Sequence, residues 1–144
     1  MNEYHGFISR LSSELAPGSL IIDCHSFPSD LADIDICIGY NDDASKPEQE
    51  MIDKATHLFD RAGFKVGLNN PYSNSITPKK PIDYKSLMIE VNKRCYMNEG
   101  TLARTVGYDI ISDLSTTSIA WYWHKRISPC VKCGVFRTSC IVLI

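Results

Sequence analysis

Four short runs of mostly apolar residues are spaced along the chain. They cover residues 19–24, 34–38, 64–68 and 87–91, and turn-forming or polar residues bound each of them. Runs of this length and composition are typical of strands that are buried on both faces, as in a parallel sheet. The pattern therefore predicts four buried strands.

Between these runs, apolar residues recur every three or four positions, which is the spacing of an amphipathic helix. This spacing predicts a helix over residues 3–16 and another over residues 101–114. The clearest helix start is Ser45 with Glu48 three residues later, a capping box, and Gly63 is the expected C-cap. The alternation of helices and strands predicts an α/β domain with a mostly parallel sheet flanked by helices.

Composition narrows the class of protein without identifying a function. The 144 residues fit one domain, with 44% hydrophobic residues, 22% charged residues and a net charge of −2. This charge offers no basic surface for nucleic acid or for an anionic membrane, and the longest apolar run, residues 140–144, is too short to span a bilayer. The N-terminus lacks the layout of a signal peptide. We expect a cytoplasmic protein that binds neither nucleic acid nor membrane.

The six cysteines fall into two groups. Those in apolar stretches, where a free thiol packs as a small hydrophobic side chain, are Cys24, Cys37 and Cys95. Those near the end of the chain, which follow His124, are Cys130, Cys133 and Cys140. The second group has the spacing of a single zinc knuckle, which is a weak signal for a structural zinc site. We expect an irregular, cysteine-rich tail over residues 115–144.

Two ionisable residues stand where apolar strands are expected. His25 directly follows the run at 19–24, and ligands of open α/β sheets bind at the carboxyl ends of strands; the alternative is a structural histidine. Glu90 lies inside the run at 87–91, and burial of an unpartnered carboxylate costs several kcal/mol. Glu90 is therefore either half of a structural ion pair or a catalytic carboxylate whose pKa is tuned by burial and a nearby metal.

A long segment over residues 69–84 separates the last two strands and contains three prolines. Asn, Pro and Ser are the usual residues of surface turns, so one interpretation is an ordinary turn-rich loop. A loop of this length inside a compact domain is more often functional. The alternative is therefore a loop that covers a substrate and supplies hydroxyl and amide hydrogen bonds.

Taken together, four segments resemble the N-formylglutamate amidohydrolase family in order and spacing, over roughly residues 4–114. They are residues 23–29 (Asp-Cys-His-Ser-Phe-Pro-Ser), 35–39 (Asp-Ile-Cys-Ile-Gly), 69–72 (Asn-Asn-Pro-Tyr) and 89–99 (Ile-Glu-Val-Asn-Lys-Arg-Cys-Tyr-Met-Asn-Glu). The pair Tyr4-His5 also matches that family. The segments around His25 and Glu90 are the specific ones, and the loop segment supports them.

The resemblance implies a zinc-peptidase-like α/β fold and a zinc-dependent hydrolase. By the family pattern, His25 would be a metal ligand and Glu90 the general base. A zinc ion with an open coordination position makes its bound water more acidic and polarises the amide carbonyl. Glu90 would take a proton from that water and pass it to the leaving nitrogen. The implied reaction is hydrolysis of N-formyl-L-glutamate, a small N-acyl amino acid, to formate and L-glutamate in histidine degradation.

Further site residues are expected around this pair. Asp23 lies two residues before His25, on the same side of a strand, and would orient the imidazole together with Ser26; Asp23 is equally compatible with a strand-end charge. The residues expected to contact the substrate are Asn69, Tyr72, Ser73, Asn92, Lys93 and Arg94. The family tends to have Arg where Lys93 stands, and Asn74 replaces a glycine that is usual in the family loop. Asn tolerates left-handed backbone geometry.

The resemblance concerns the C-terminal portion of the family. We expect residues 1–114 to form the C-terminal half of the family domain, so the fold would be incomplete. A catalytic zinc site has three protein ligands, and the family pattern identifies only His25. His5 and Asp35 are the alternatives within this chain. We therefore expect another chain or segment to supply the missing half, and we expect this chain alone to bind zinc weakly and to hydrolyse little substrate.

Three functions remain open. The first is an amidohydrolase completed by its missing half or by a partner chain. The second is a catalytically inactive binding or interaction module that keeps the fold, and the third is a degenerate fragment of the family with no function. Activity that is lost on replacing Glu90 with glutamine, while the fold is retained, would favour the first.

Overall fold

The computed structural model describes residue 13 and residues 15–78, 80–114, 132–135 and 140–143. Its elements are β1 (Ser19–Phe27), β2 (Ile36–Tyr40), α2 (Gln49–Arg61), β3 (Val66–Leu68), β4 (Tyr84–Asn92), the 3-10 helix η1 (Lys93–Cys95), β5 (Lys132–Val135) and β6 (Cys140–Leu143). Residues 107–114 are also helical, so the helix predicted over 101–114 begins later than expected. The helix predicted over residues 3–16 falls almost wholly outside the described residues.

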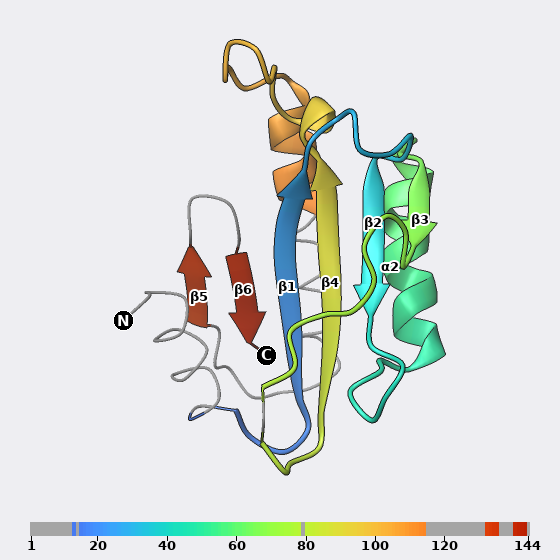
Figure 1. Ribbon diagram of the computed structural model, residues 1–144, viewed down its shortest axis with the longest axis vertical. Coiled ribbons are helices and arrows are strands. Elements are labelled where there is room, and N and C mark those ends of the chain that lie inside the picture. The colour runs from blue at the N-terminus through green and yellow to red at the C-terminus, as the bar shows by residue number, and fades with distance from the viewer. Residues whose placement is uncertain (1–12, 14, 79, 115–131, 136–139, 144) are drawn as a thin grey trace.

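The strands form one sheet in the order β3-β2-β4-β1-β6-β5 (Figure 1). β1 runs parallel to β4 and β2 runs parallel to β3, whereas the pairs β2–β4, β1–β6 and β5–β6 are antiparallel. The predicted α/β class is confirmed, but the sheet is mixed rather than mostly parallel. Two parallel strands that follow one another in the sequence need a crossover connection between them. Among the first four strands only β2 and β3 have such a connection, and it contains α2. The other connections between the first four strands are loops, which reverse the chain.

The final segment of the chain is not irregular throughout, contrary to our expectation for residues 115–144. β5 and β6 lie in it, and β6 pairs with the edge of β1 that β4 leaves open. The run Cys-Ile-Val-Leu at residues 140–143 is apolar and contains β-branched residues, which favour strands, and β1 offers a row of backbone hydrogen-bonding groups to it. His124 and Cys130 of the possible zinc knuckle lie outside the described residues.

One face of the sheet packs against α2, which lies behind β2 and β3 in Figure 1. The alternating side chains of the central strands point to this face and form the main hydrophobic core with one stripe of the helix. Its buried members include Leu20, Ile22, Ile36, Ile38, Leu87, Ile89 and Val91 from the strands, and Ile52, Ala55 and Phe59 from α2. No helix in the described ranges is both long and apolar enough to cross a membrane.

The start of α2 differs from the sequence prediction. The helix begins directly after Glu48, whose side chain makes no capping hydrogen bond. Ser45 is instead held in the preceding turn, because its backbone N–H and its hydroxyl both donate to Asp43 Oδ1, at 2.7 and 2.6 Å. The predicted capping box is therefore wrong. At the other end Ala62 is the C-cap, and Gly63 follows it with a φ of 90°, in the left-handed region that glycine tolerates.

Candidate active site

The strands that carry the two candidate residues continue past the ends expected from the apolar runs. β1 extends to Phe27, so His25 lies within it and not just beyond its end. In the sheet register the Cα of His25 faces that of Glu90 on β4, and Glu90 faces Cys37 on β2. Facing residues of neighbouring strands project to the same face of a sheet. His25, Glu90 and Cys37 therefore form one row across three strands, which we call the site row.

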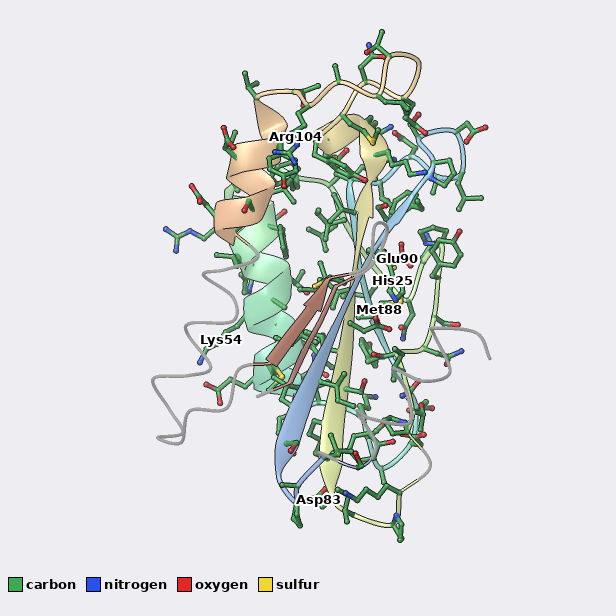
Figure 2. All side chains as sticks on the ribbon, turned by 90° about the vertical axis from the view of Figure 1, so that its left-hand side faces the viewer. His25, Lys54, Asp83, Met88, Glu90 and Arg104 are labelled. Carbon is green, nitrogen blue, oxygen red and sulfur yellow. The ribbon has the colours of Figure 1, made fainter. Side chains whose placement is uncertain are left out.

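The site row lies on the face of the sheet away from α2. Figure 2 shows His25, Glu90 and Met88 together on one side, while Lys54 marks the helix on the other. The burial pattern agrees, since Cys24 and Ile89, each one position along the strand, belong to the core beneath α2. An imidazole and a carboxylate that are far apart in the sequence thus meet on one surface, which is the geometric condition that a shared metal imposes.

Asp23 contacts the histidine directly. Its Oδ1 lies 2.5 Å from His25 Nε2, and the side chain of Asp23 is only 3% exposed, compared with 29% for His25. The neighbouring Asp23 carboxylate, assisted by Glu90, raises the pKa of His25, although burial of the imidazole acts in the opposite direction. The period-two prediction that Asp23 and His25 share one side of the strand is confirmed.

Glu90 is buried, with 8% of the residue exposed. This burial raises the pKa of its carboxyl group, the nearby His25 lowers it in part, and Asp23 raises it further. Its Oε2 is buried without a hydrogen-bond partner in the part of the chain that the structure describes. A carboxyl group with a raised pKa is suited to accept and release a proton near neutral pH.

The Asp23–His25 contact predicts a pH-dependent stability of the metal-free chain. The pKa of His25 is higher in the folded state than its ordinary value of 6.5, so its stabilising contribution is complete below that value and is lost as the pH rises through the folded-state pKa. We expect the free energy of unfolding to fall across this window, by at most about 1.4 kcal/mol per pH unit for one proton. The pKa of Glu90 is also raised in the folded state, from an ordinary value of 4.5. Its contribution to the free energy of unfolding therefore also falls as the pH rises, beginning at a lower pH than that of His25.

This dependence is measured by urea unfolding at several pH values with a chelator present. Replacing Asp23 with asparagine removes the main cause of the raised pKa of His25, so the fall in stability above pH 6.5 becomes shallower. His57→Ala is the matched control, because His57 is an exposed histidine of α2. An unchanged slope in Asp23→Asn would contradict the assignment to this pair.

The long loop between β3 and β4 crosses the face that carries the site row (Figure 1). The Cys37 thiol donates a hydrogen bond to the Tyr72 carbonyl oxygen at 3.2 Å, and the Tyr72 ring packs edge-on against Phe27 with centroids 6.2 Å apart. A Cβ on Gly39 would lie 2.8 Å from the Asn74 carbonyl oxygen, so glycine is needed for this close approach. Asn74 has a φ of 77°, in the left-handed region expected for it.

Two of the residues expected to contact substrate are held in hydrogen bonds of the fold. Asn69 begins the loop, and its Oδ1 accepts a hydrogen bond from the Tyr40 N–H at 2.9 Å. Asn92 is fully buried at the end of β4, where its side-chain amide donates to the Ile34 carbonyl oxygen at 2.9 Å. Ser26, expected beside Asp23, projects to the other face of β1, because it faces Val91 of the core beneath α2.

The other expected substrate contacts are distributed differently. Arg94 forms ion pairs with two aspartates. Its Nη2 lies 2.9 Å from Asp35 Oδ1 and 3.5 Å from Asp33 Oδ1. Lys93 is half-buried at the first position of η1. Tyr72 and Ser73 are exposed on the loop, with Tyr72 40% exposed. The structure therefore places Tyr72 beside Cys37 of the site row and pairs Arg94 with Asp33 and Asp35.

Sequence reasoning missed Cys37 as a member of the site row. Its immediate neighbours Ile36 and Ile38 point into the core, so the alternation within the apolar run could have placed Cys37 on the other face. The alignment of Cys37 with Glu90 could not have been found, because it depends on the antiparallel register of β2 and β4.

The donor atoms of this site fit zinc in kind but not in number. Zinc takes imidazole nitrogen and carboxylate oxygen, and both are present in His25, Asp23 and Glu90. Glu90 Oε2 is buried without a hydrogen-bond partner among the described residues, as is expected where a cation would compensate it. Within the same residues there is no group of three side chains placed to hold a metal ion. His5 lies outside them.

Comparison with known proteins identifies the family of the chain. The family model of N-formylglutamate amidohydrolase matches residues 2–97. The fold resembles the crystal structure of the N-formylglutamate amidohydrolase of Ralstonia eutropha JMP134, with a TM-score of 0.59 and 24% sequence identity. This similarity covers 72% of this chain and 43% of that one, so the chain spans less than half the length of its structural relative. No curated protein matches the chain. The chain belongs to the N-formylglutamate amidohydrolase family.

Proposed function

We propose that this chain carries part of a zinc-dependent amidohydrolase site that hydrolyses N-formyl-L-glutamate, with His25 as a metal ligand and Glu90 as the proton-transfer group. The observation that supports this most strongly is the register that sets His25 opposite Glu90 on one face of the sheet. Membership of the family supports the amide substrate. This reaction would place the chain in histidine degradation.

In this proposal Asp23 orients the imidazole. His25 turns Nε2 toward the Asp23 carboxylate, so Nδ1 would be the ring nitrogen left to hold the metal. Carboxylates that hold a metal-binding histidine in this manner fix its orientation and make it a better ligand. A bound zinc ion supplies a more acidic water and polarises the formyl carbonyl group.

Glu90 would move one proton. Its buried carboxylate takes the proton from the attacking water and delivers it to the nitrogen of the departing L-glutamate. The loop that carries Tyr72 and Ser73 would exclude bulk water from this step and contact the substrate. Arg94 would reach a substrate carboxylate only by releasing Asp33 and Asp35, so its role in substrate binding requires those ion pairs to break.

The remaining metal ligands would come from outside the described residues, either from another segment or from a partner chain. This follows from the single imidazole in the site and from the length of the structural relative, of which 43% is covered. The same observation favours a second candidate function, an interaction module of the family without catalysis. Formate release from N-formyl-L-glutamate that disappears in Glu90→Gln would exclude this second function.

The proposal is tested by titrating the 144-residue chain with zinc, in a background carrying Cys130→Ser and Cys133→Ser so that these thiols do not take up the metal. We expect weak binding, which is abolished in His25→Ala because the substitution removes the imidazole ligand. His57→Ala, which alters an exposed histidine of α2, should bind zinc as the parent does. Formate release is measured at saturating zinc and again with a chelator.

Two results would overturn the proposal. The first is zinc binding in His25→Ala that equals the parent, because the metal would then be held elsewhere. The second is formate release that continues unchanged when the chelator has removed the metal. Low activity in the isolated chain is the expected outcome, and it should rise with zinc concentration.

A further inference from the structure

Two cysteines from opposite ends of the chain face one another in the sheet. β6 pairs antiparallel with β1, and in this register the Cα of Cys140 faces the Cα of Cys24. These two residues are separated by most of the sequence, so only the pairing of the last strand with the first brings them together. Neither the N-formylglutamate reaction nor the site row uses them.

Their placement meets the geometric requirement for a disulfide. Directly facing residues of an antiparallel pair have Cα atoms about 4.5–5.5 Å apart, and disulfides bridge Cα separations of about 4.4–6.8 Å. Facing residues also start their side chains on the same side of the sheet. Cys24 is half-buried at the margin of the core beneath α2, so it is not sealed inside that core.

The other described cysteines do not face a cysteine in the register of the sheet. Cys37 is buried under the loop, where its thiol donates to the Tyr72 carbonyl oxygen. Burial and the neighbouring Asp35 raise the pKa of Cys95 to about 12, which keeps it as an unreactive thiol. In the register of the sheet, Cys37 faces Glu90 and Cys133 faces Val142. Among the cysteines that the structure describes, Cys24 and Cys140 are therefore the two that face one another.

We propose that Cys24 and Cys140 form a reversible disulfide that fastens β6 to β1, the strand that carries His25. The oxidant is a small disulfide such as oxidised glutathione. The thiolate of one cysteine attacks a sulfur of this disulfide and releases one small thiol, and the second cysteine then attacks the mixed disulfide and releases the other. The two protein thiols are oxidised to one S–S bond, the small disulfide is reduced to two thiols, and the two protons end on these thiols.

This bond would matter because β6 has only four residues, Cys140–Leu143. A strand of this length is held by few backbone hydrogen bonds. A crosslink between residues so far apart in the sequence removes much of the freedom of the unfolded chain, and its effect grows with the size of the closed loop. Reduction would then leave β6 held to β1 by the pairing alone, next to the strand position of His25.

The test compares the reduced chain with the chain equilibrated in oxidised glutathione. We expect the oxidised chain to lose two alkylatable thiols and to yield a proteolytic peptide in which fragmentation locates a Cys24–Cys140 bond. Its melting temperature should rise by roughly 10 °C and return on reduction. Cys140→Ser should abolish both the crosslink and the rise, whereas Cys133→Ser should keep both.

Two outcomes would overturn the proposal. One is that Cys24 and Cys140 both remain alkylatable at a glutathione poise that oxidises surface dithiols. The other is that Cys140 is found bonded to Cys130 or Cys133, with no rise in melting temperature. Cys140→Ser exchanges one sulfur atom for oxygen in a strand of four residues, so a folded variant is expected, and the far-ultraviolet spectrum verifies it.

Discussion

Replacing Glu90 with glutamine is expected to lower the rate of formate release from N-formyl-L-glutamate by about 100- to 10,000-fold, because the amide cannot accept the proton of the attacking water. Glutamine has the same shape and fills the same space on β4. The substitution also removes a carboxylate whose burial raises its pKa, so the fold should be at least as stable above neutral pH as the parent. The rate is measured at saturating zinc, under conditions where the parent exceeds its chelated background.

Glu48→Gln provides the matched control, since Glu48 is exposed before α2 and its side chain makes no capping bond. It should retain the parental rate. If Glu90→Gln and the parent released formate equally fast at saturating zinc, Glu90 would have no part in proton transfer. A loss of structure in Glu90→Gln would instead point to the ion-pair interpretation of this residue.

Replacing Phe59 with alanine is expected to destabilise the fold by about 3–5 kcal/mol, the usual cost of removing a fully buried phenylalanine ring. Phe59 is 0% exposed on the inner side of α2, and its ring lies edge-on to Phe64 with centroids 6.5 Å apart. The substitution leaves a cavity between α2 and the sheet, on the face opposite the site row. Urea unfolding measures the loss.

His57→Ala, two positions away on the exposed side of α2, should change the free energy of unfolding by less than about 0.5 kcal/mol. Because Phe59 lies behind the sheet, molecules of Phe59→Ala that remain folded should keep the raised pKa of His25. A destabilisation of less than about 1 kcal/mol would mean that α2 contributes little to holding the sheet.

The sequence was sufficient to predict strands β1, β2, β3 and β4, because each contains Ile, Leu or Val side chains that pack against the core beneath α2. The prediction that all four are buried is wrong for β3, which lies at the edge of the sheet and leaves Leu68 45% exposed. It also placed Asp23 and His25 on one side of β1 from the period of a strand alone. The prediction ended β1 at Cys24, since the criterion was an apolar run and the strand continues through His25 and Ser26. Polar residues within a strand interrupt the apolar pattern that marks it, so a prediction based on apolar runs ends the strand too early.

Strand direction and pairing were beyond the reach of the sequence pattern. The chain between β2 and β4 passes through α2, β3 and a long loop, and an apolar run does not tell at which end of the sheet each of these connections lies. For the same reason Cys37 could not be assigned to the site row, and the pairing of β6 with β1 was not foreseen. Ser45 was misassigned because a Ser with Glu three residues later also occurs where Asp43 ties the serine into a turn.

The site row lies within hydrogen-bonded strands, whereas the residues proposed to contact the substrate lie on a loop. The proposed chemistry and the proposed substrate preference therefore depend on different parts of the fold. His25, Asp23 and Glu90 are held by the rigid centre of the sheet, whereas Tyr72 and Ser73 belong to a loop laid over it. Insertions and substitutions are tolerated in such loops far better than in central strands. Relatives of this chain could therefore diverge in the acyl group or amino acid that they accept while retaining the same spacing of imidazole and carboxylates beneath.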